Sequence, residues 1–256
     1  MTGATTRQMV RIKSPSEIEA MRGSAGLVSR TLDELAGHVR AGVTTLELDR
    51  LAMEFIRKNG GTPSFLGYRG YRHTICASVN EEVVHGIPGK RVLKDGDIIS
   101  VDVGVLMNGF HGDSARTFAV GAVTDEAQKL LRVTSESLGK GIEQVKAGNR
   151  LGDVSAAIQA HVESHGFSIV RSLVGHGIGR DLHEDPQIAN YGNPGSGIVL
   201  KPGMVFAIEP MVNVGGWEVE TLRDGWTVIS SDRSLAAHFE HTVAVTENGP
   251  DILSLS

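Results

Sequence analysis

Four carboxylates and one histidine stand at positions from which their side chains could meet in a single metal site. In the first half of the chain, Asp102 ends the apolar run IISVD and Asp113 follows in GFHGDSARTF; in the second half, Glu209 ends the run VFAIE. Glu240 stands among apolar neighbours in HFEHTVAV, which is predicted to be one strand, and His176 lies between glycines in GHGIG. A buried carboxylate is costly unless it is paired, protonated or bound to a cation. Four close together would repel one another, so a pair of divalent cations is the more favourable arrangement.

This ligand set predicts hydrolysis assisted by two metal ions. Carboxylates and an imidazole without a thiolate form a hard, oxygen-rich set that suits Mn, Fe(II) or Co, and Zn also fits. Two ions about 3.5 to 4 Å apart can bridge a water molecule, lower its pKa and polarise the carbonyl that the water attacks. The competing interpretation is that aspartates near a turn are solvated and that a lone histidine is structural. For Asp102 this is the weaker interpretation, because its neighbours on both sides are apolar.

A duplicated segment connects two of these carboxylates. Residues 92–102 read VLKDGDIISVD, and residues 199–209, 107 positions later, read VLKPGMVFAIE. Both copies contain VLK, a glycine two residues further on, and an apolar strand that ends in a carboxylate, Asp102 in one copy and Glu209 in the other. Two such endpoints related by duplication predict one site shared by two similar halves.

A short hairpin should bring Asp102 and Asp113 together. Asn108-Gly109 is a strong signal for a two-residue hairpin loop, and the residues on both sides suit strands. A loop at this place sets the register, so that Asp102 pairs with Ala115. Asp113 then pairs with Gly104, which is expected to leave room beside it. The two aspartates lie on one face as diagonal neighbours, about 7 to 8 Å apart, so both can reach one cation.

Two helices in the first half are predicted from their caps and apolar faces. The first starts at residues 14–17, SPSE, where serine caps the helix, proline takes the first helical position and glutamate returns to the cap. The second starts at Thr44, with Glu47 in the capping-box position, and stops at Gly60. The pattern of this second helix recurs 106 positions later, over residues 147–166.

These elements predict one structural domain with internal pseudo-twofold symmetry. Each half also carries His-Gly-Ile, at 85–87 and at 176–178, but the second half holds 16 more residues before its strand, roughly between 179 and 195. Helices alternate with hairpins, so we expect mixed α/β structure with strongly antiparallel strand pairing. A unit of this length that occurs only twice is no solenoid. We expect residues 11–256 to form a single catalytic domain and residues 1–10 a flexible tail.

Composition and charge indicate a cytoplasmic protein without a general nucleic-acid or membrane surface. The 256 residues carry a formal net charge of −5, which gives no reason to expect binding to polyanions. The first ten residues lack the apolar run of a signal peptide, and no stretch approaches the ~20 apolar residues that span a bilayer. Cys76 is the single cysteine. It excludes an internal disulfide and all-cysteine zinc sites, and it fits a reducing compartment.

The motifs around the candidate ligands closely resemble those of the type I methionine aminopeptidases of bacteria. The resemblance covers essentially the whole chain after about residue 10 and is carried by GYRGYRHTICASVNEEVVHGIPG, SVDVG, GFHGDSARTF, GHGIGRDLHEDP, FAIEPM, DGWTV and FEHTVAV. It implies the pita-bread fold, in which two pseudo-twofold-related halves contribute antiparallel sheet covered by helices. It also implies a dinuclear metal site in which Asp113 and Glu240 bridge the ions. The implied ligands are Asp102, Asp113, His176, Glu209 and Glu240.

The resemblance further implies catalytic roles for Glu209, His183 and His85. Glu209 matches the family's proposed proton shuttle, His183 would hydrogen-bond the scissile carbonyl, and His85 would contact the substrate. For both histidines a purely structural role is the alternative. The methionine side chain would lie among apolar residues, where Phe65 and Leu182 stand in place of a cysteine and a phenylalanine frequent in the family. The implied substrate-binding residues are Phe65, Tyr68, Tyr71, Cys76, His85, Leu182, His183 and Trp226.

The activity that the resemblance implies is that of a metalloaminopeptidase, a hydrolase of protein maturation. It would remove the N-terminal methionine from nascent proteins when the second residue is small, with two divalent ions, Co, Mn, Fe(II) or Zn, as cofactors. Its partners would be peptides and nascent chains that begin with methionine; the ribosome is a candidate partner, and a monomer is expected. Two alternatives stay open. One is a peptidase like aminopeptidase P or prolidase, and the other is a non-catalytic binding protein on the same fold.

Overall fold

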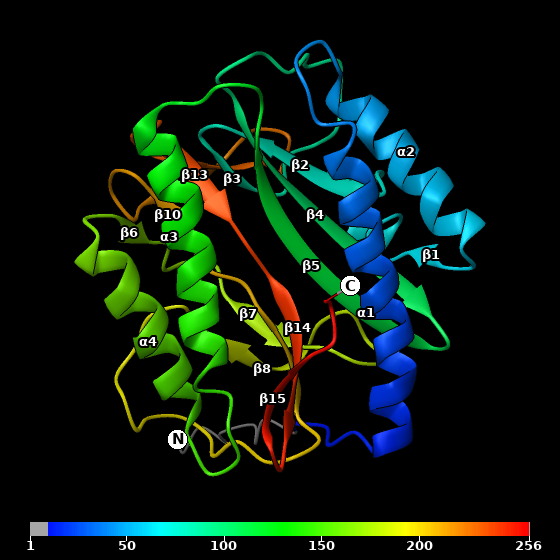
Figure 1. The fold of residues 1–256 in the computed structure, drawn as a ribbon, viewed down its shortest axis with the longest axis vertical. Coiled ribbons are helices and arrows are strands. Elements are labelled where there is room, and N and C mark those ends of the chain that lie inside the picture. Colours follow the sequence, from blue (N-terminus) through cyan, green and yellow to red (C-terminus); the bar gives the residue numbers. More distant parts are fainter. Residues whose placement is uncertain (1–9, 256) are drawn as a thin grey trace, which may run out of the picture.

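Within residues 10–255, which the computed structural model describes, four α-helices lie in two pairs, one for each half of the chain (Figure 1). The tail expected at residues 1–10 lies outside the described residues except for Val10. In Figure 1 the blue pair and the green pair stand on opposite sides of the molecule, with strands between them. The helices are α1 (Pro15–Ala36), α2 (Thr45–Lys58), α3 (Asp125–Ile142) and α4 (Leu151–Ser164), with a 3-10 turn, η1, at Tyr68–Gly70.

Both helices of the first half begin where their caps predict. The Ser14 hydroxyl accepts a hydrogen bond of 3.3 Å from the backbone N–H of Glu17, and the Glu17 carboxylate accepts one of 3.0 Å from the N–H of Ser14. Thr44 caps α2 through the backbone N–H of Glu47, at 3.1 Å. These contacts satisfy N–H groups that have no partner inside a helix. The predicted helix starts are therefore confirmed.

The strands form small sheets in which every pairing is antiparallel, so the predicted α/β arrangement is confirmed. In the first half, β4 pairs with β5 along one edge and with β2 and β1 along the other; in the second half, the order is β15-β14-β9-β7-β8. Two further sheets have the orders β13-β10-β6 and β11-β12-β3. The strand bounds are β1 Thr62–Pro63, β2 Ile75–Val79, β3 Glu82–Val84, β4 Ile98–Met107, β5 Phe110–Ala119, β6 Ser168–Ile169, β7 Gly175–Gly177, β8 Glu184–Ile188, β9 Val205–Ile208, β10 Met211–Asn213, β11 Val219–Thr221, β12 Val228–Ser230, β13 Ala236–His238, β14 His241–Thr246 and β15 Gly249–Ile252.

The sequence repeat is also a repeat of structure. An isolated β-bridge joins Thr44, before α2, to Val92, and an equivalent bridge joins Arg150, before α4, to Val199. The strands β4 and β9 then begin 107 positions apart, which is the spacing of the duplicated segment. In each half, therefore, a β-bridge joins the residue before the second helix to the first valine of the duplicated segment.

The predicted hairpin is present with the predicted register. β4 and β5 are joined by Asn108 and Gly109, whose φ angles of 54° and 78° are the left-handed values that such a loop requires. Asp102 pairs with Ala115, and Gly104 pairs with Asp113. Both aspartates therefore lie on one face of the hairpin, as diagonal neighbours.

Each helix pair covers its own apolar core, and a further core lies at the junction of the halves. α1 and α2 pack on β2 and β4 through fully buried side chains such as Leu48 and Val101. α3 and α4 pack on β9 and β14 through others such as Val154 and Phe206. Burial of one such side chain contributes about 1.5–3 kcal/mol, so the two cores hold the halves that meet at the site. Between residues 10 and 255, no helix is both long and apolar enough to cross a membrane.

Candidate metal centre and its pocket

The five predicted ligands line one cavity at the junction of the two halves. β4 and β5 supply the first two, β7 supplies the histidine, and the last two stand beside the ends of β9 and β14. Neighbouring donors lie close enough to share a cation: one ligand atom each from Asp113, His176 and Glu240 lie within 4.8 Å of one another. The ligands brought together are Asp102, Asp113, His176, Glu209 and Glu240.

The strand expected to contain Glu240 is interrupted at that residue. β13 ends at His238 and β14 begins at His241. The reason is that the chain changes sheets here: β13 pairs with β10, whereas β14 pairs with β9. At the crossing, the backbone N–H of Glu240 donates to the Ala115 carbonyl of β5 at 2.9 Å. The expectation of one continuous strand was wrong, and the break places Glu240 beside the residue that pairs with Asp102.

Three buried carboxylate oxygens in the cavity have no hydrogen-bond partner among the described residues. They are Asp102 Oδ1, Asp113 Oδ1 and Glu240 Oε1. An unpartnered buried oxygen of this kind carries a desolvation penalty of roughly 1–3 kcal/mol, and more if it is charged. Oxygen donors that converge on one point without hydrogen-bond donors fit the coordination shell of a divalent cation. The residues present therefore fit a metal centre.

The pKa values of the carboxyls agree with this interpretation. Burial raises the pKa of Asp102 to about 7. Burial, together with repulsion from the neighbouring carboxylates, raises the pKa of Asp113, Glu209 and Glu240 well above the usual range. Without a cation the group would retain protons at neutral pH, whereas a bound cation reverses that preference.

His176 is oriented as a metal ligand requires. Its Nδ1 lies 2.9 Å from the Gly177 carbonyl oxygen and must donate to it, which leaves the lone pair on Nε2. Nε2 faces the cavity, 3.6 Å from Glu209 Oε1. Burial lowers the pKa of His176 to about 4, so the imidazole is neutral at pH 7. The flanking glycines serve packing, since a Cβ on Gly177 would lie 2.3 Å from the Asp185 carbonyl oxygen.

Two residues at the site are absent from the sequence-based expectations: His238, which lies beside Glu209, and Arg69. His238 is fully buried, and its Nε2 lies 3.7 Å from Glu209 Oε2. A signal for it exists, because His238 stands two positions before Glu240 and side chains two apart on extended backbone share a face. Arg69 lines the cavity, with its guanidinium 5.3 Å from the centre of the Tyr68 ring.

All eight predicted substrate-binding residues line the same cavity. Aromatic rings form its walls: Tyr71 and Trp226 meet edge to face at 5.0 Å, and Tyr68 stacks on His183 at 5.2 Å. The space that Gly104 leaves is occupied by Phe65, since a Cβ on Gly104 would lie 2.6 Å from the Phe65 ring. The residues are Phe65, Tyr68, Tyr71, Cys76, His85, Leu182, His183 and Trp226.

Both predicted catalytic histidines are neutral at pH 7. Burial, with a smaller contribution from the positive charge of Arg69, lowers the pKa of His183 to about 3. Burial also lowers the pKa of His85. The His183 ring lies 4.1 Å from that of His176, which brings it to the edge of the candidate ligand group. A neutral imidazole at this place retains one N–H that can donate to a substrate oxygen.

A buried ion pair holds the loop that carries His183 against the beginning of the described chain. Lys13 Nζ lies 2.7 Å from Glu184 Oε2, and the two side chains are 5% and 3% exposed. The other oxygen of Glu184 accepts hydrogen bonds from the backbone N–H groups of Arg180 and Asp181. The carboxylate next to His183 therefore organises the loop on both sides.

Lys13→Met is expected to lower the free energy of unfolding by about 3 kcal/mol, because it leaves the buried Glu184 carboxylate with only the 56% exposed Arg11, 3.2 Å from Oε1, as a cationic partner. Replacing both residues, with Glu184→Gln added, should recover part of that loss. Urea denaturation measures both effects. Arg22→Met is the control, because the Arg22–Asp251 pair is 41% and 34% exposed and should contribute about 1 kcal/mol or less. A loss in Lys13→Met no larger than in the control would contradict the role of the buried pair.

Comparisons with known proteins agree with this geometry. A family model described as Metallopeptidase family M24 matches residues 19–247. Methionine aminopeptidase 1 of Bacillus subtilis (strain 168) is 57% identical over 246 residues, which cover 96% of this chain and 99% of the relative. A solved methionine aminopeptidase from Thermotoga maritima is 51% identical, with a TM-score of 0.96, and the match covers 97% of this chain and 100% of that one. A prolidase from Pyrococcus furiosus, at 22% identity and a TM-score of 0.79 over 96% of this chain and 65% of its own, shares the fold.

Proposed function

The chain belongs to metallopeptidase family M24 and is a metalloaminopeptidase of the methionine aminopeptidase type, and we propose that its pocket removes the N-terminal methionine of nascent proteins whose second residue is small. The fold is the pita-bread fold that its relatives share. The observation that carries the proposal is one cavity lined both by a set of metal donors and by apolar, aromatic side chains. The three unpartnered carboxylate oxygens in that cavity add support.

In the proposed site, two divalent cations would be held by Asp102, Asp113, His176, Glu209 and Glu240. When bound, such a pair lowers the pKa of a water molecule and polarises the carbonyl that the water attacks. Asp113 and Glu240, which offer atoms to the same point as His176, would bridge the pair. Support for a cation comes from the burial and the mutual repulsion of these carboxyls, which together raise their pKa values when no cation is bound.

Proton transfer and charge stabilisation would be carried by side chains at the edge of the donor set. Glu209 would accept a proton from the attacking water and pass it to the leaving nitrogen. Its carboxylate lies between the Nε2 atoms of His176 and His238, at 3.6 and 3.7 Å, which limits its orientation. His183 would donate its N–H to the oxygen of the scissile carbonyl, where negative charge develops. His85, beside Trp226 at 6.4 Å between ring centres, would contact the substrate.

Methionine at the first position would lie against Phe65, Tyr71, Cys76, Leu182 and Trp226. Aromatic and soft side chains suit an unbranched thioether, and sulfur makes favourable contacts with ring edges. Each methylene contributes only modest discrimination, about 10- to 200-fold. Because Phe65 and Leu182 differ from residues frequent in the family, they are the positions at which tolerance of methionine analogues should be decided.

Several finer features of this activity are part of the proposal. The metal in the cell would be Co, Mn, Fe(II) or Zn, because the oxygen-rich donor set suits these ions. The proposal includes action on nascent chains in the cytoplasm, with the ribosome as a partner and the protein as a monomer. The single cysteine, Cys76, is reduced and buried in the pocket wall, which is consistent with a reducing compartment.

Release of methionine from the peptide Met-Ala-Ser tests the proposal. Purified protein should release it with Mn or Co added, and excess chelator should abolish release until metal is restored. Xaa-Pro dipeptides serve as the control substrate, since a prolidase-like enzyme would prefer them. Absence of turnover with each of Mn, Fe(II), Co and Zn would contradict the enzymatic function and favour a binding protein.

A further inference from the structure

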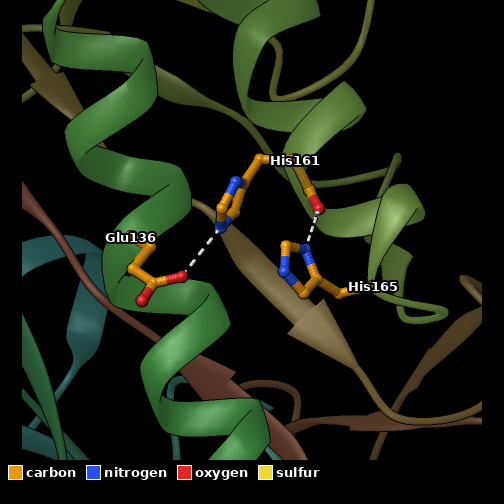
Figure 2. Close-up of side chains that lie close together, drawn as sticks. All are labelled: Glu136, His161 and His165. Carbon is orange, nitrogen blue, oxygen red and sulfur yellow. Dashed lines mark hydrogen bonds and ion pairs between the residues drawn. The ribbon is translucent and has the colours of Figure 1, made fainter.

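A second group of candidate metal ligands lies on the α3–α4 helix pair and does not line the pocket (Figure 2). Glu136 projects from α3, His161 projects from α4, and His165 is the residue directly after α4. One ligand atom from each of the three lies within 4.8 Å of the others. Figure 2 shows the Glu136 carboxylate reaching across to the His161 ring, with the His165 ring below it.

The hydrogen bonds of His165 leave one of its nitrogens free to bind a metal. Nδ1 lies 2.8 Å from the backbone carbonyl oxygen of His161, one helical turn earlier, and must donate a proton to it. The lone pair is therefore on Nε2, which is the ring nitrogen that faces the other two side chains in Figure 2. A hydrogen bond from the second ring nitrogen to a backbone carbonyl is the usual support of a metal-binding histidine.

The other two donors are also close and oriented toward this point. His161 Nε2 lies 3.1 Å from Glu136 Oε2. The centres of the two imidazole rings are 4.6 Å apart, with 46° between the ring planes. At this distance one metal ion can accept a lone pair from each imidazole. In a tetrahedral zinc site, bonds of about 2.0–2.1 Å put donor atoms about 3.3 Å apart, so rotations of side chains suffice.

The three residues stand on a backbone that holds them in register. His161 and His165 are four residues apart and so lie on one face of α4 and its last turn. α3 and α4 pack closely, since a Cβ on Gly141 would lie 2.7 Å from the Ile158 side chain. The His161 side chain is 17% exposed, so its position is restrained while water can still reach the group.

We propose that Glu136, His161 and His165 bind one divalent transition-metal ion of the zinc type, with water completing the coordination. Two imidazoles and one carboxylate suit Zn²⁺ and similar ions, and they suit Mg²⁺ or Ca²⁺ poorly because those ions prefer oxygen. The ion would join α3 to α4. It would therefore stabilise the second half without taking part in the reaction.

Zinc counts on the full chain test this site separately from the catalytic centre. Equilibrium dialysis against micromolar Zn²⁺, followed by metal analysis, should find one more ion per chain in the wild-type protein than in His161→Ala. His38→Ala is the matched control, because His38, just after α1, pairs with Glu34 of α1 at 3.3 Å without belonging to a three-ligand group of the described residues. The control should retain the wild-type count. Equal counts in wild type and His161→Ala would overturn the proposal.

Glu136→Gln keeps the shape and the exposed position of the glutamate but removes its charge. It should raise the dissociation constant of this one ion about tenfold or more. Zn²⁺ should also raise the melting temperature of the wild-type protein by a few degrees more than that of either variant. Methionine release should stay at the wild-type rate in both variants. A zinc response in Glu136→Gln identical to that of the wild type would contradict the site, whatever the outcome of the activity assays.

Discussion

Asp113→Asn is expected to lower kcat by about 10³-fold or more while the protein remains folded. The proposed role of Asp113 is to bridge two cations, and an amide supplies neither the negative charge nor a second oxygen. The backbone at this position is held independently of the carboxylate: its N–H donates to Thr242 Oγ1 at 3.0 Å, and its carbonyl accepts from the same hydroxyl at 2.7 Å. The substitution should therefore remove the metal bridge and leave the hairpin in place.

The stability of the metal-free protein gives this prediction a second readout. Burial and neighbouring carboxylates raise the pKa of Asp113 in the folded state above its pKa in the unfolded chain. The contribution of this group to the free energy of unfolding is therefore largest below the unfolded-state pKa and is lost as the pH rises. Asparagine cannot ionise, and so metal-free Asp113→Asn should melt no lower than metal-free wild type at pH 7. Asp125→Asn, at an exposed position in the first turn of α3, is the matched control and should retain full activity. Wild-type turnover in Asp113→Asn would refute the bridging role.

The first two carboxylates could be predicted from the sequence because local signals determine their positions. The Asn108-Gly109 loop admits only one short register, and from it the pairing of Asp102 with Ala115 follows by counting. Glu240 follows no such rule. Its position depends on the chain leaving one sheet for another, which is a matter of long-range packing, and so the continuous strand that its apolar neighbours suggest is not formed.

The pocket could be predicted only through the resemblance to a known family. Phe65, Tyr71 and Leu182 are 8%, 3% and 3% exposed, values shared with ordinary core residues. A residue of a pocket wall faces a cavity, whereas a core residue faces other side chains. Composition carries no information about this difference. The repeat has the same limit: it accounts for Asp102 and Glu209 as equivalent strand ends, but the surplus that carries His183 has no counterpart in the first half. The ion pair of Lys13 with Glu184 could not be predicted from local signals either, because it joins residues 171 positions apart.

His183→Ala is expected to lower kcat by about 10²- to 10³-fold, a typical effect of removing one donor to a developing oxyanion, with a much smaller change in bound metal. His183 is neutral at pH 7 because burial lowers its pKa to about 3, so its loss removes an N–H donor and not a charge. Its ring is held between the rings of Tyr68 and His176, at 5.2 and 4.1 Å. A hydrogen-bonding role therefore predicts a loss of kcat much larger than the loss of bound metal, whereas a purely structural role predicts that both fall together.

Metal content and kcat measured on the same samples separate these two roles. His183→Asn, which retains an N–H donor, should recover part of kcat relative to alanine, and KM should change less than kcat in both variants. His73→Ala is the matched control, because His73 pairs with Asp49 at 3.3 Å and does not line the pocket. Equal losses of metal and of kcat in His183→Ala would make His183 a structural support of the metal centre. In that case the donor to the scissile carbonyl would have to be sought at His85, the other neutral imidazole in the pocket wall.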